Sequence, residues 1–203
     1  MKSFITTARL SLMALVCLAV PVTAQEKLEK LVDLKVKPES NKTPSIKAEF
    51  AKEKRSTPKD WIEIECELKA ELSAKAADKS MKSYPELTFK YYVYLEGTGK
   101  EKKVLTGEVT HTNVPIGEKV HSVMYVTPAT ILAVTGKNMY SIPKAYAVEV
   151  LLNGQRVGFE SSTNKTDPWW DTPGYLKVPE LKTKAETPFA SLYGDYYLDI
   201  KAR

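Results

Sequence analysis

The chain has 203 residues, a formal net charge of +5 and two cysteines. Lysine and glutamate are interleaved along most of its length, which is typical of a solvated surface and leaves no concentrated basic stripe for nucleic acid. A single domain is expected at this length, and the sequence contains no internal repeat or low-complexity tract.

The first 24 residues have the layout of a secretory signal peptide. A positive start at Lys2 and Arg9 precedes a short apolar run, and small residues end at Ala24, where cleavage is expected. The apolar run is too short to span a bilayer. Cleavage would leave 179 residues, a net charge of +3 and one cysteine, Cys66. We therefore expect an exported protein without an intrachain disulfide, located in the periplasm, on the outer-membrane surface or outside the cell.

The start of the mature chain is ambiguous between a helix and a strand. Residues 25–37 fit both spacings, and we favour a strand from about Leu31. Alternating apolar residues predict another strand at 45–51. The segments 38–44 and 51–59 are rich in Lys, Glu, Ser and Pro, which indicates loops.

The clearest long strand is predicted at 61–72. Its even-numbered residues are apolar and its odd-numbered residues are mostly charged, which is typical of an antiparallel sheet with one buried face. Cys66 falls on the buried face, so we interpret it as a small core residue rather than a reactive thiol. The same alternation predicts strands at 86–96, where Tyr92 faces outward, and at 102–112 and 118–127.

Two local signals are specific. Thr127, Pro128 and Gly136 suit the cap, first turn and C-terminal end of a short helix. The dipeptide Asn153-Gly154, between two runs of β-forming residues at 144–162, predicts a β-hairpin with a type I′ turn.

The residues after the hairpin differ in character. Residues 164–177 are rich in turn formers, and a short helix is expected near 189–198. We interpret residues from about 163 to 203 as a C-terminal extension packed across one domain that spans 25–203. The regular spacing of strands and turns predicts a sandwich or barrel rather than βαβ units.

Motifs for catalysis or cofactor binding are absent: there is no G-x-S-x-G, H-E-x-x-H, P-loop or G-x-G-x-x-G sequence. We therefore expect no enzyme, no cofactor and no metal. His111 and His121 could face each other across a hairpin and bind a metal, but without a clear third ligand we expect sheet-surface residues. Aspartates near aromatic residues, at 167, 171, 195 and 199, raise the alternative of a glycosidase, which needs paired carboxylates in a cleft.

The best candidates for an external contact are Trp169 and Trp170, bracketed by Asp167 and Asp171. Flat aromatic faces beside carboxylates suit a protein partner or a sugar ring. The alternative is that the tryptophans cover a sheet edge. Asn41-Lys42-Thr43 and Asn164-Lys165-Thr166 also match glycosylation sequons.

Two segments carry a resemblance to a known group of proteins. These are YAVEVLLNGQRVGFES at 146–161 and ETPFAxL at 186–192, followed by Asp195-Tyr196-Tyr197. With the signal peptide, they make the chain resemble small exported immunoglobulin-like β-sandwich proteins of mucus-dwelling gut bacteria, which are encoded beside type IV pilus-like components. The resemblance implies an antiparallel immunoglobulin-like β-sandwich with one or two short helices and a structural role in the envelope. It implies no catalytic residues.

The chain departs from a true pilin, because its apolar run is expected to be removed and its mature start is polar. The leading hypothesis is therefore an exported, non-enzymatic protein that contacts envelope or pilus-assembly proteins, with self-association as a further option. A carbohydrate-binding module that uses Trp169 and Trp170 is the alternative, and a hydrolase is the third. An extended N-terminal segment that completes another subunit's sheet is a variant of the first.

Overall fold

The computed structural model describes residues 30–44, 57–74, 76, 78–99, 101–139, 142–163 and 168–202. The predicted signal peptide and the strand expected at 45–51 lie outside these residues. The described elements are β1 (Val32–Lys42), β2 (Asp60–Ala70), β3 (Ser83–Tyr94), β4 (Lys102–Pro115), β5 (Lys119–Val126), α1 (Pro128–Thr135), β6 (Ala145–Leu152), β7 (Gln155–Ser161), β8 (Tyr175–Val178) and β9 (Leu181–Thr183), with short 3-10 helices η1 (Trp169–Asp171), η2 (Lys184–Glu186) and η3 (Gly194–Tyr196).

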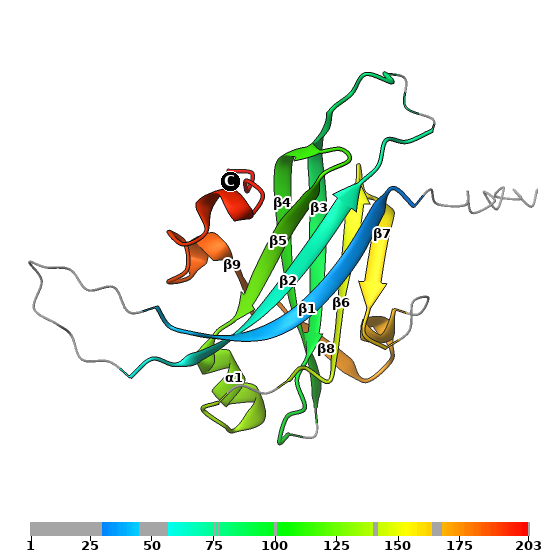
Figure 1. Cartoon of the computed structure of the whole chain (residues 1–203). Helices are drawn as coiled ribbons and strands as arrows, with labels where there is room; N and C mark the ends of the chain where they lie inside the picture. The colour runs from blue at the N-terminus through cyan, green and yellow to red at the C-terminus, as the bar shows by residue number, and fades with distance from the viewer. Residues whose placement is uncertain are drawn as a thin grey trace, which may run out of the picture.

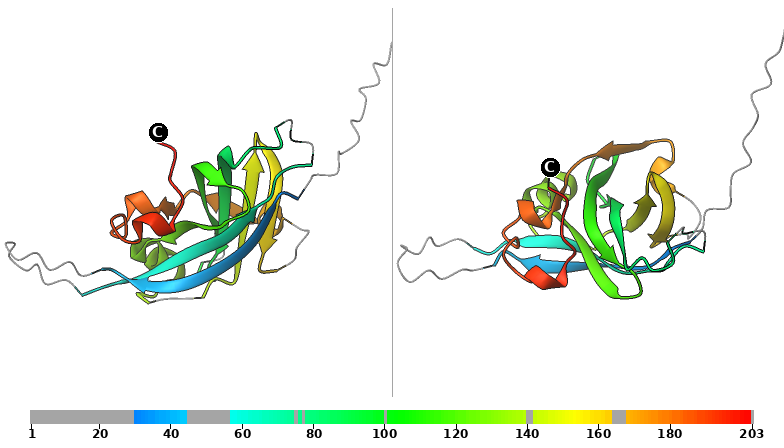
Figure 2. Two further views of the ribbon diagram at one scale, coloured as in Figure 1. Left: turned by 45° about the horizontal axis from the view of Figure 1, so that its top comes forward. Right: turned by 90° about the horizontal axis from the view of Figure 1, so that it is seen from above.

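The strands form two sheets that face each other (Figures 1 and 2). One has the order β1-β2-β5-β9 and the other the order β7-β6-β3-β4-β8. Every neighbouring pair is antiparallel except β4 and β8. The grouping of β1-β2-β5 against β7-β6-β3-β4 is that of an immunoglobulin-like sandwich. The predicted all-β sandwich is confirmed.

The core lies between the sheets, and strand alternation explains its composition. The even-numbered residues of β2 from Ile62 to Ala70 are all buried, as the sequence predicted. Phe89, Tyr91 and Val93 of β3 face them from the other sheet. Burial also raises the pKa of the Cys66 thiol well above its ordinary value, so this thiol is an inert part of the core.

The two specific local signals are confirmed. The Thr127 hydroxyl accepts a hydrogen bond from the Thr130 N–H at the start of α1, and Gly136 ends the helix with φ 70°. Asn153 and Gly154 both have positive φ, at 51° and 79°, as a type I′ turn requires.

Two expectations about local structure are wrong. The segment 38–44 was expected to be a loop, but β1 continues through Pro38 to Lys42. Pro38 fits there because β1 is an edge strand, where a missing N–H costs little. The helix expected near 189–198 is replaced by turns and η3, because these residues dock on the sandwich rather than forming a helix of their own.

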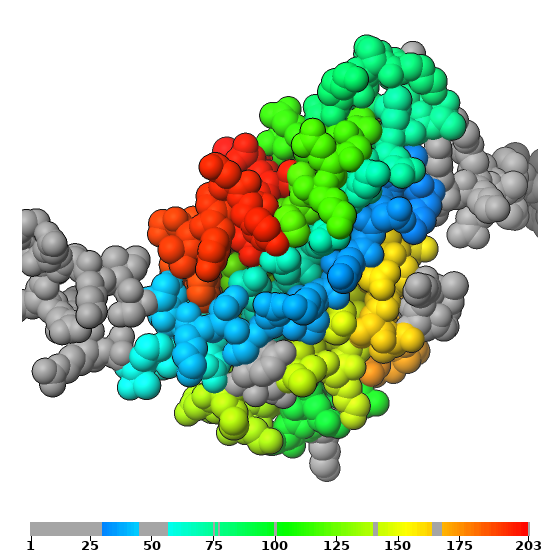
Figure 3. Space-filling model, in the orientation of Figure 1, coloured from blue at the N-terminus to red at the C-terminus, as the bar shows by residue number. Residues whose placement is uncertain are grey.

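The C-terminal extension, defined here as residues 168–202, adds a strand to each of the two sheets. Its strand β8 pairs with β4 and its strand β9 with β5, which belong to different sheets. Further along, the N–H of Leu198 donates to the His121 carbonyl at 2.9 Å, and the N–H of Lys201 donates to the Thr110 carbonyl at 2.8 Å. In Figure 3 its last residues, in red, lie against β5 and reach the blue β1 region. No helix within the described part of the chain is long and apolar enough to cross a membrane.

Candidate functional site

The tryptophan pair lies on the outer face of the five-stranded sheet. The short helix η1 places the Trp170 ring against Tyr92 of β3, with ring centroids 4.3 Å apart and planes 13° from parallel. Val104 and Ala147 complete the contact. Trp170 is only 2% exposed and therefore offers no face to an outside partner. Tyr92 points outward as predicted, but the extension covers it.

The other candidate contact residues are placed differently. Trp169 is half-buried, and its indole N–H donates to the Ser161 hydroxyl at 3.2 Å. Asp171 is exposed and forms an ion pair with Lys177. Asp167 lies outside the described residues. Contact of this loop with a protein or glycan remains a prediction, and among the three described candidates only Asp171 and part of Trp169 are accessible.

His111 takes part in a buried hydrogen-bond chain between the sheets. Its Nδ1 lies 3.1 Å from the backbone carbonyl of Asp199, and its Nε2 lies 2.7 Å from the Ser122 hydroxyl. Because a carbonyl only accepts, Nδ1 carries the proton, and the Ser122 hydroxyl donates to Nε2. The Tyr91 hydroxyl donates to Ser122 at 2.7 Å. Each polar group in this chain therefore has a partner.

The pair His111 and Ser122 resembles a nucleophile with its base, but its surroundings oppose catalysis. Ser122 is 0% exposed and His111 is 2% exposed, so a substrate has no route to the hydroxyl. Burial lowers the pKa of His111 to about 4, which keeps the ring neutral. We interpret the chain as a structural link between the two sheets and the extension. The expectation that His111 is a sheet-surface residue is wrong.

His121 does not join His111 in a metal site. The neighbouring Ser122 points into the core, so His121 points to the outer face of the four-stranded sheet. The two strands that carry the histidines also belong to different sheets. Within the residues that the structure describes, no group of three His, Cys, Asp or Glu side chains could hold a metal ion.

A carboxylate and tyrosine cluster lies on the same outer face, under the end of the extension. Glu63 accepts hydrogen bonds from Asn41, at 2.6 Å, and from the Tyr197 hydroxyl, at 3.2 Å. The Tyr197 hydroxyl also lies 3.2 Å from Glu65. Burial raises the pKa of Glu63, although these hydrogen bonds oppose the shift. The Asn41 amide of the first sequon is thus used inside the protein.

His121 and Tyr196 extend this cluster toward the surface. Their rings stack with centroids 4.0 Å apart. The Tyr196 hydroxyl donates to Glu65 at 3.2 Å, and the His121 Nδ1 lies 3.3 Å from the same carboxylate. This cluster fixes the extension to β2 and β5.

The aspartates considered for a glycosidase, as far as the structure describes them, are not brought together. Asp171 lies with the tryptophan pair on one face of the sandwich, whereas Asp199 contributes its backbone carbonyl to the His111 chain. Asp195 is exposed in η3. The described aspartates therefore form no carboxylate pair of the kind that glycoside hydrolysis needs.

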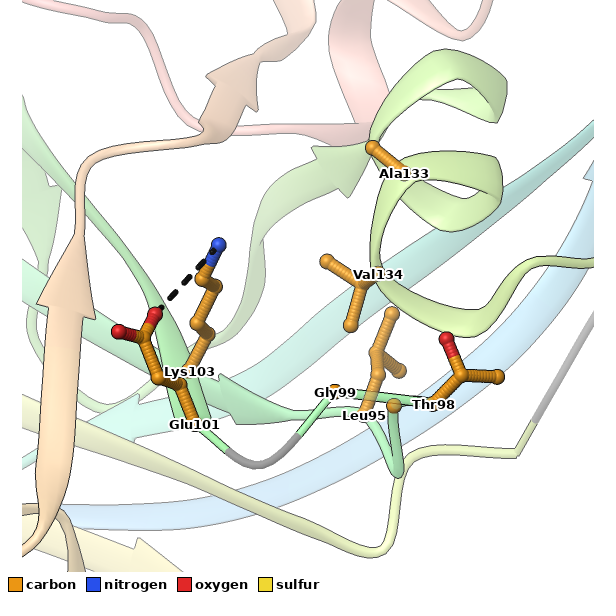
Figure 4. Close-up of a pocket in the computed structure, with 8 residues that line it drawn as sticks. Leu95, Thr98, Gly99, Glu101, Lys103, Ala133 and Val134 are labelled. Atoms are coloured by element: carbon orange, nitrogen blue, oxygen red, sulfur yellow. Dashed lines mark ion pairs between the residues drawn. The ribbon is translucent and has the colours of Figure 1, made fainter.

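A pocket of about 280 Å³ lies between α1 and the turn from β3 to β4 (Figure 4). Leu95 and Val134 form its apolar part, and Thr98 and Gly99 of the turn border it. Lys103 and Glu101, which form an ion pair at 4.0 Å, stand on one side. The sequence predicted both the helix and the turn, but it gave no signal that they would be adjacent. The pocket can accept an apolar side chain.

Comparisons with known proteins agree with the fold. A crystal structure of a protein from Akkermansia muciniphila is similar to this chain, with a TM-score of 0.71 and 26% identity, and the match covers 85% of this chain and 95% of that one. No curated protein matches the chain. One protein-family model matches residues 22–203, which is nearly the whole length. The chain therefore belongs to the family that this model describes and shares its fold with the Akkermansia muciniphila protein.

Proposed function

We propose that this chain is an exported, non-enzymatic β-sandwich protein that acts by protein–protein contact in the bacterial envelope, as an accessory to type IV pilus-like machinery. The observation that carries the proposal is that the side chains able to react chemically are buried in the core. Ser122, His111 and Cys66 are all buried in the core. The described pocket contains no nucleophile with an adjacent base.

Two further observations support export and an envelope location. The first residues have the layout of a signal peptide, and the similar crystal structure comes from a bacterium of the mucus-dwelling kind that the sequence resemblance indicates. Strands β8 and β9 continue both sheets, which gives the protein a rigid scaffold for presenting a surface.

Crosslinking in the native bacterium, followed by fractionation, tests the proposal. We expect the protein in the envelope fraction, crosslinked to pilus-assembly proteins, and we expect crosslinking to decrease in a strain that lacks those components. A cytoplasmic location, or the absence of any envelope neighbour, would contradict the proposal. A matched strain that carries Ser122→Ala tests the missing catalytic role. The variant should be less stable, because His111 and Tyr91 lose a buried hydrogen-bond partner, but its folded fraction should crosslink as wild type does.

A further inference from the structure

Exposed apolar side chains gather at one end of the sandwich. Leu132, Met139, Ile142 and Leu176 are 42%, 60%, 73% and 50% exposed. Three of them lie in α1 or in the residues that follow it. The fourth, Leu176 in β8, lies opposite Lys103 of the paired strand β4, and Lys103 lines the pocket beside α1. We call this surface the α1 end.

The outward face of α1 is unusual for a surface helix. The helix contains no charged residue, and its exposed positions include Ala129, Leu132 and Ala133. Helices on the surface of a soluble domain normally place polar residues on the solvent side. The pocket opens beside this face, so an apolar ridge lies next to a socket whose apolar part is formed by Leu95 and Val134 and whose polar part is formed by Thr98, Glu101 and Lys103.

The α1 end carries more lysines than glutamates. Its exposed lysines are Lys102, Lys103, Lys137 and Lys144, against Glu96, Glu101 and Glu180. Each glutamate already has a partner: Glu96 pairs with Lys144 at 2.8 Å, Glu101 pairs with Lys103 at 4.0 Å, and Glu180 accepts from the Thr130 hydroxyl at 3.3 Å. Among the described residues, no carboxylate is paired with Lys102 or Lys137. The complementary partner surface is therefore acidic.

We propose, on the basis of the proposed function, that the α1 end binds an acidic protein segment. The segment places one apolar side chain in the pocket and carboxylates against Lys102 and Lys137. A side-chain-sized socket favours a protein over a lipid surface, since a bilayer offers no single anchor to fill it. A symmetric contact with a second copy would place a surface with more lysines than glutamates against itself, which leaves Lys102 and Lys137 without an excess of carboxylates to face.

Synthetic peptides test this surface directly. One library of acetylated heptapeptides has a central Leu, Ile or Phe flanked by Asp and Glu, and a matched library has Lys at the flanking positions. Binding is measured by fluorescence anisotropy. We expect saturable binding of acidic peptides only, weakened about tenfold by Ile142→Glu or Lys137→Glu. Tyr193→Glu, at an exposed residue of the extension, is the control and should bind as wild type.

Several results would overturn the inference. The inference fails if the protein binds no acidic peptide, or if it binds lysine-flanked peptides equally well. It also fails if Tyr193→Glu weakens peptide binding as much as Ile142→Glu does. Sedimentation with phosphatidylglycerol vesicles that depends on Ile142 would assign the surface to a membrane instead, and a dimer lost in Ile142→Glu would assign it to a second copy.

If cells with Ile142→Glu keep all crosslinks to envelope proteins, the α1 end is not the docking surface but the proposed function stands. If wild type gives no such crosslinks, the proposed function itself fails.

Discussion

The two parts of the C-terminal extension cover the sandwich in different ways. The first part, from Trp169 to Val178, covers one outer face with stacked rings, and Trp170 on Tyr92 is its main contact. The second part, from Lys184 to Lys201, covers the other outer face with Phe189 and with hydrogen bonds to carboxylates. The main contact of the first cover is between aromatic rings, whereas the second makes its contacts partly through buried groups that titrate.

This difference separates two sources of stability. An apolar cover depends on the area that it buries and on ring geometry, so it changes little with pH. A cover that joins Glu63 and His111 depends on their protonation, since burial shifts the pKa of each. Variants in each part should therefore respond to different conditions.

The largest effect is expected from Trp170→Ala. The substitution removes a buried ring from its contact with Tyr92, and the free energy of unfolding should fall by about 3–5 kcal/mol. Urea denaturation at pH 7 and at pH 5 should give a similar loss. Leu176→Ala, at an exposed residue of the same part, should change stability by less than about 0.5 kcal/mol. If Trp170→Ala lowers the free energy of unfolding no more than this control does, the stacking of Trp170 on Tyr92 does not stabilise the fold.

The next effect concerns acid and His111. Burial lowers the pKa of this ring from 6.5 to about 4. The unfolded chain therefore takes up a proton at a higher pH than the folded chain, and stability is lost as the pH falls from about 6.5 to 4. The loss should be on the order of 3 kcal/mol.

Denaturation curves across this pH range provide the measurement. His111→Gln, which cannot titrate, should lower stability at pH 7 but flatten its fall toward pH 4. If wild type and variant lose stability in parallel, His111 is not the group responsible.

Glu63 should act in the opposite direction. Its pKa is raised in the folded protein by burial, so the folded state binds its proton at a higher pH than the unfolded state. Its contribution grows as the pH falls through the folded pKa. Glu63→Gln should remove this gain and make the loss of stability on acidification steeper than in wild type, by less than the His111 effect. Hydrogen exchange of the Leu198 amide reports on the second cover, and an unchanged pH dependence there would contradict the assignment.

The smallest effect is expected from Trp169→Phe. This change keeps an aromatic ring but removes the hydrogen bond to Ser161, and it should lower the free energy of unfolding by about 1 kcal/mol.

The same variant also distinguishes a carbohydrate-binding module from a protein that acts by protein contact. We expect no saturable binding of wild type on a glycan array. Binding that is present in wild type and lost in Trp169→Phe would favour a carbohydrate-binding module over protein contact.

Local patterns in the sequence predicted the scaffold well. The alternation in β2 identifies its buried face, and Asn153-Gly154 identifies the hairpin turn, because both signals depend only on neighbouring residues. The cap of α1 is predictable for the same reason. On the outer face of β2, alternation places Trp61 and Glu63 in solvent, but the extension covers both.

The candidate site was harder to predict because it depends on where the extension docks. Nothing near Trp170 in the sequence indicates that its ring will stack on Tyr92, and nothing near His111 indicates the Asp199 carbonyl. The α1 end likewise arises from the adjacency of a helix, a turn and β8. Contacts between residues far apart in the chain carry no local pattern, so only the structure shows them.

The route of the extension also has a consequence for the order of folding. Residues 197–201 bond to both β5 and β4, which lie in different sheets. The contacts that the end of the extension makes with both sheets can thus form only after nearly all of the chain has been synthesised. Contacts of such long sequence separation are slow to form. Until then the outer-face side chains of Trp61, Tyr92 and Tyr125 are open to solvent, and apolar surface that is exposed during folding makes a chain prone to aggregate.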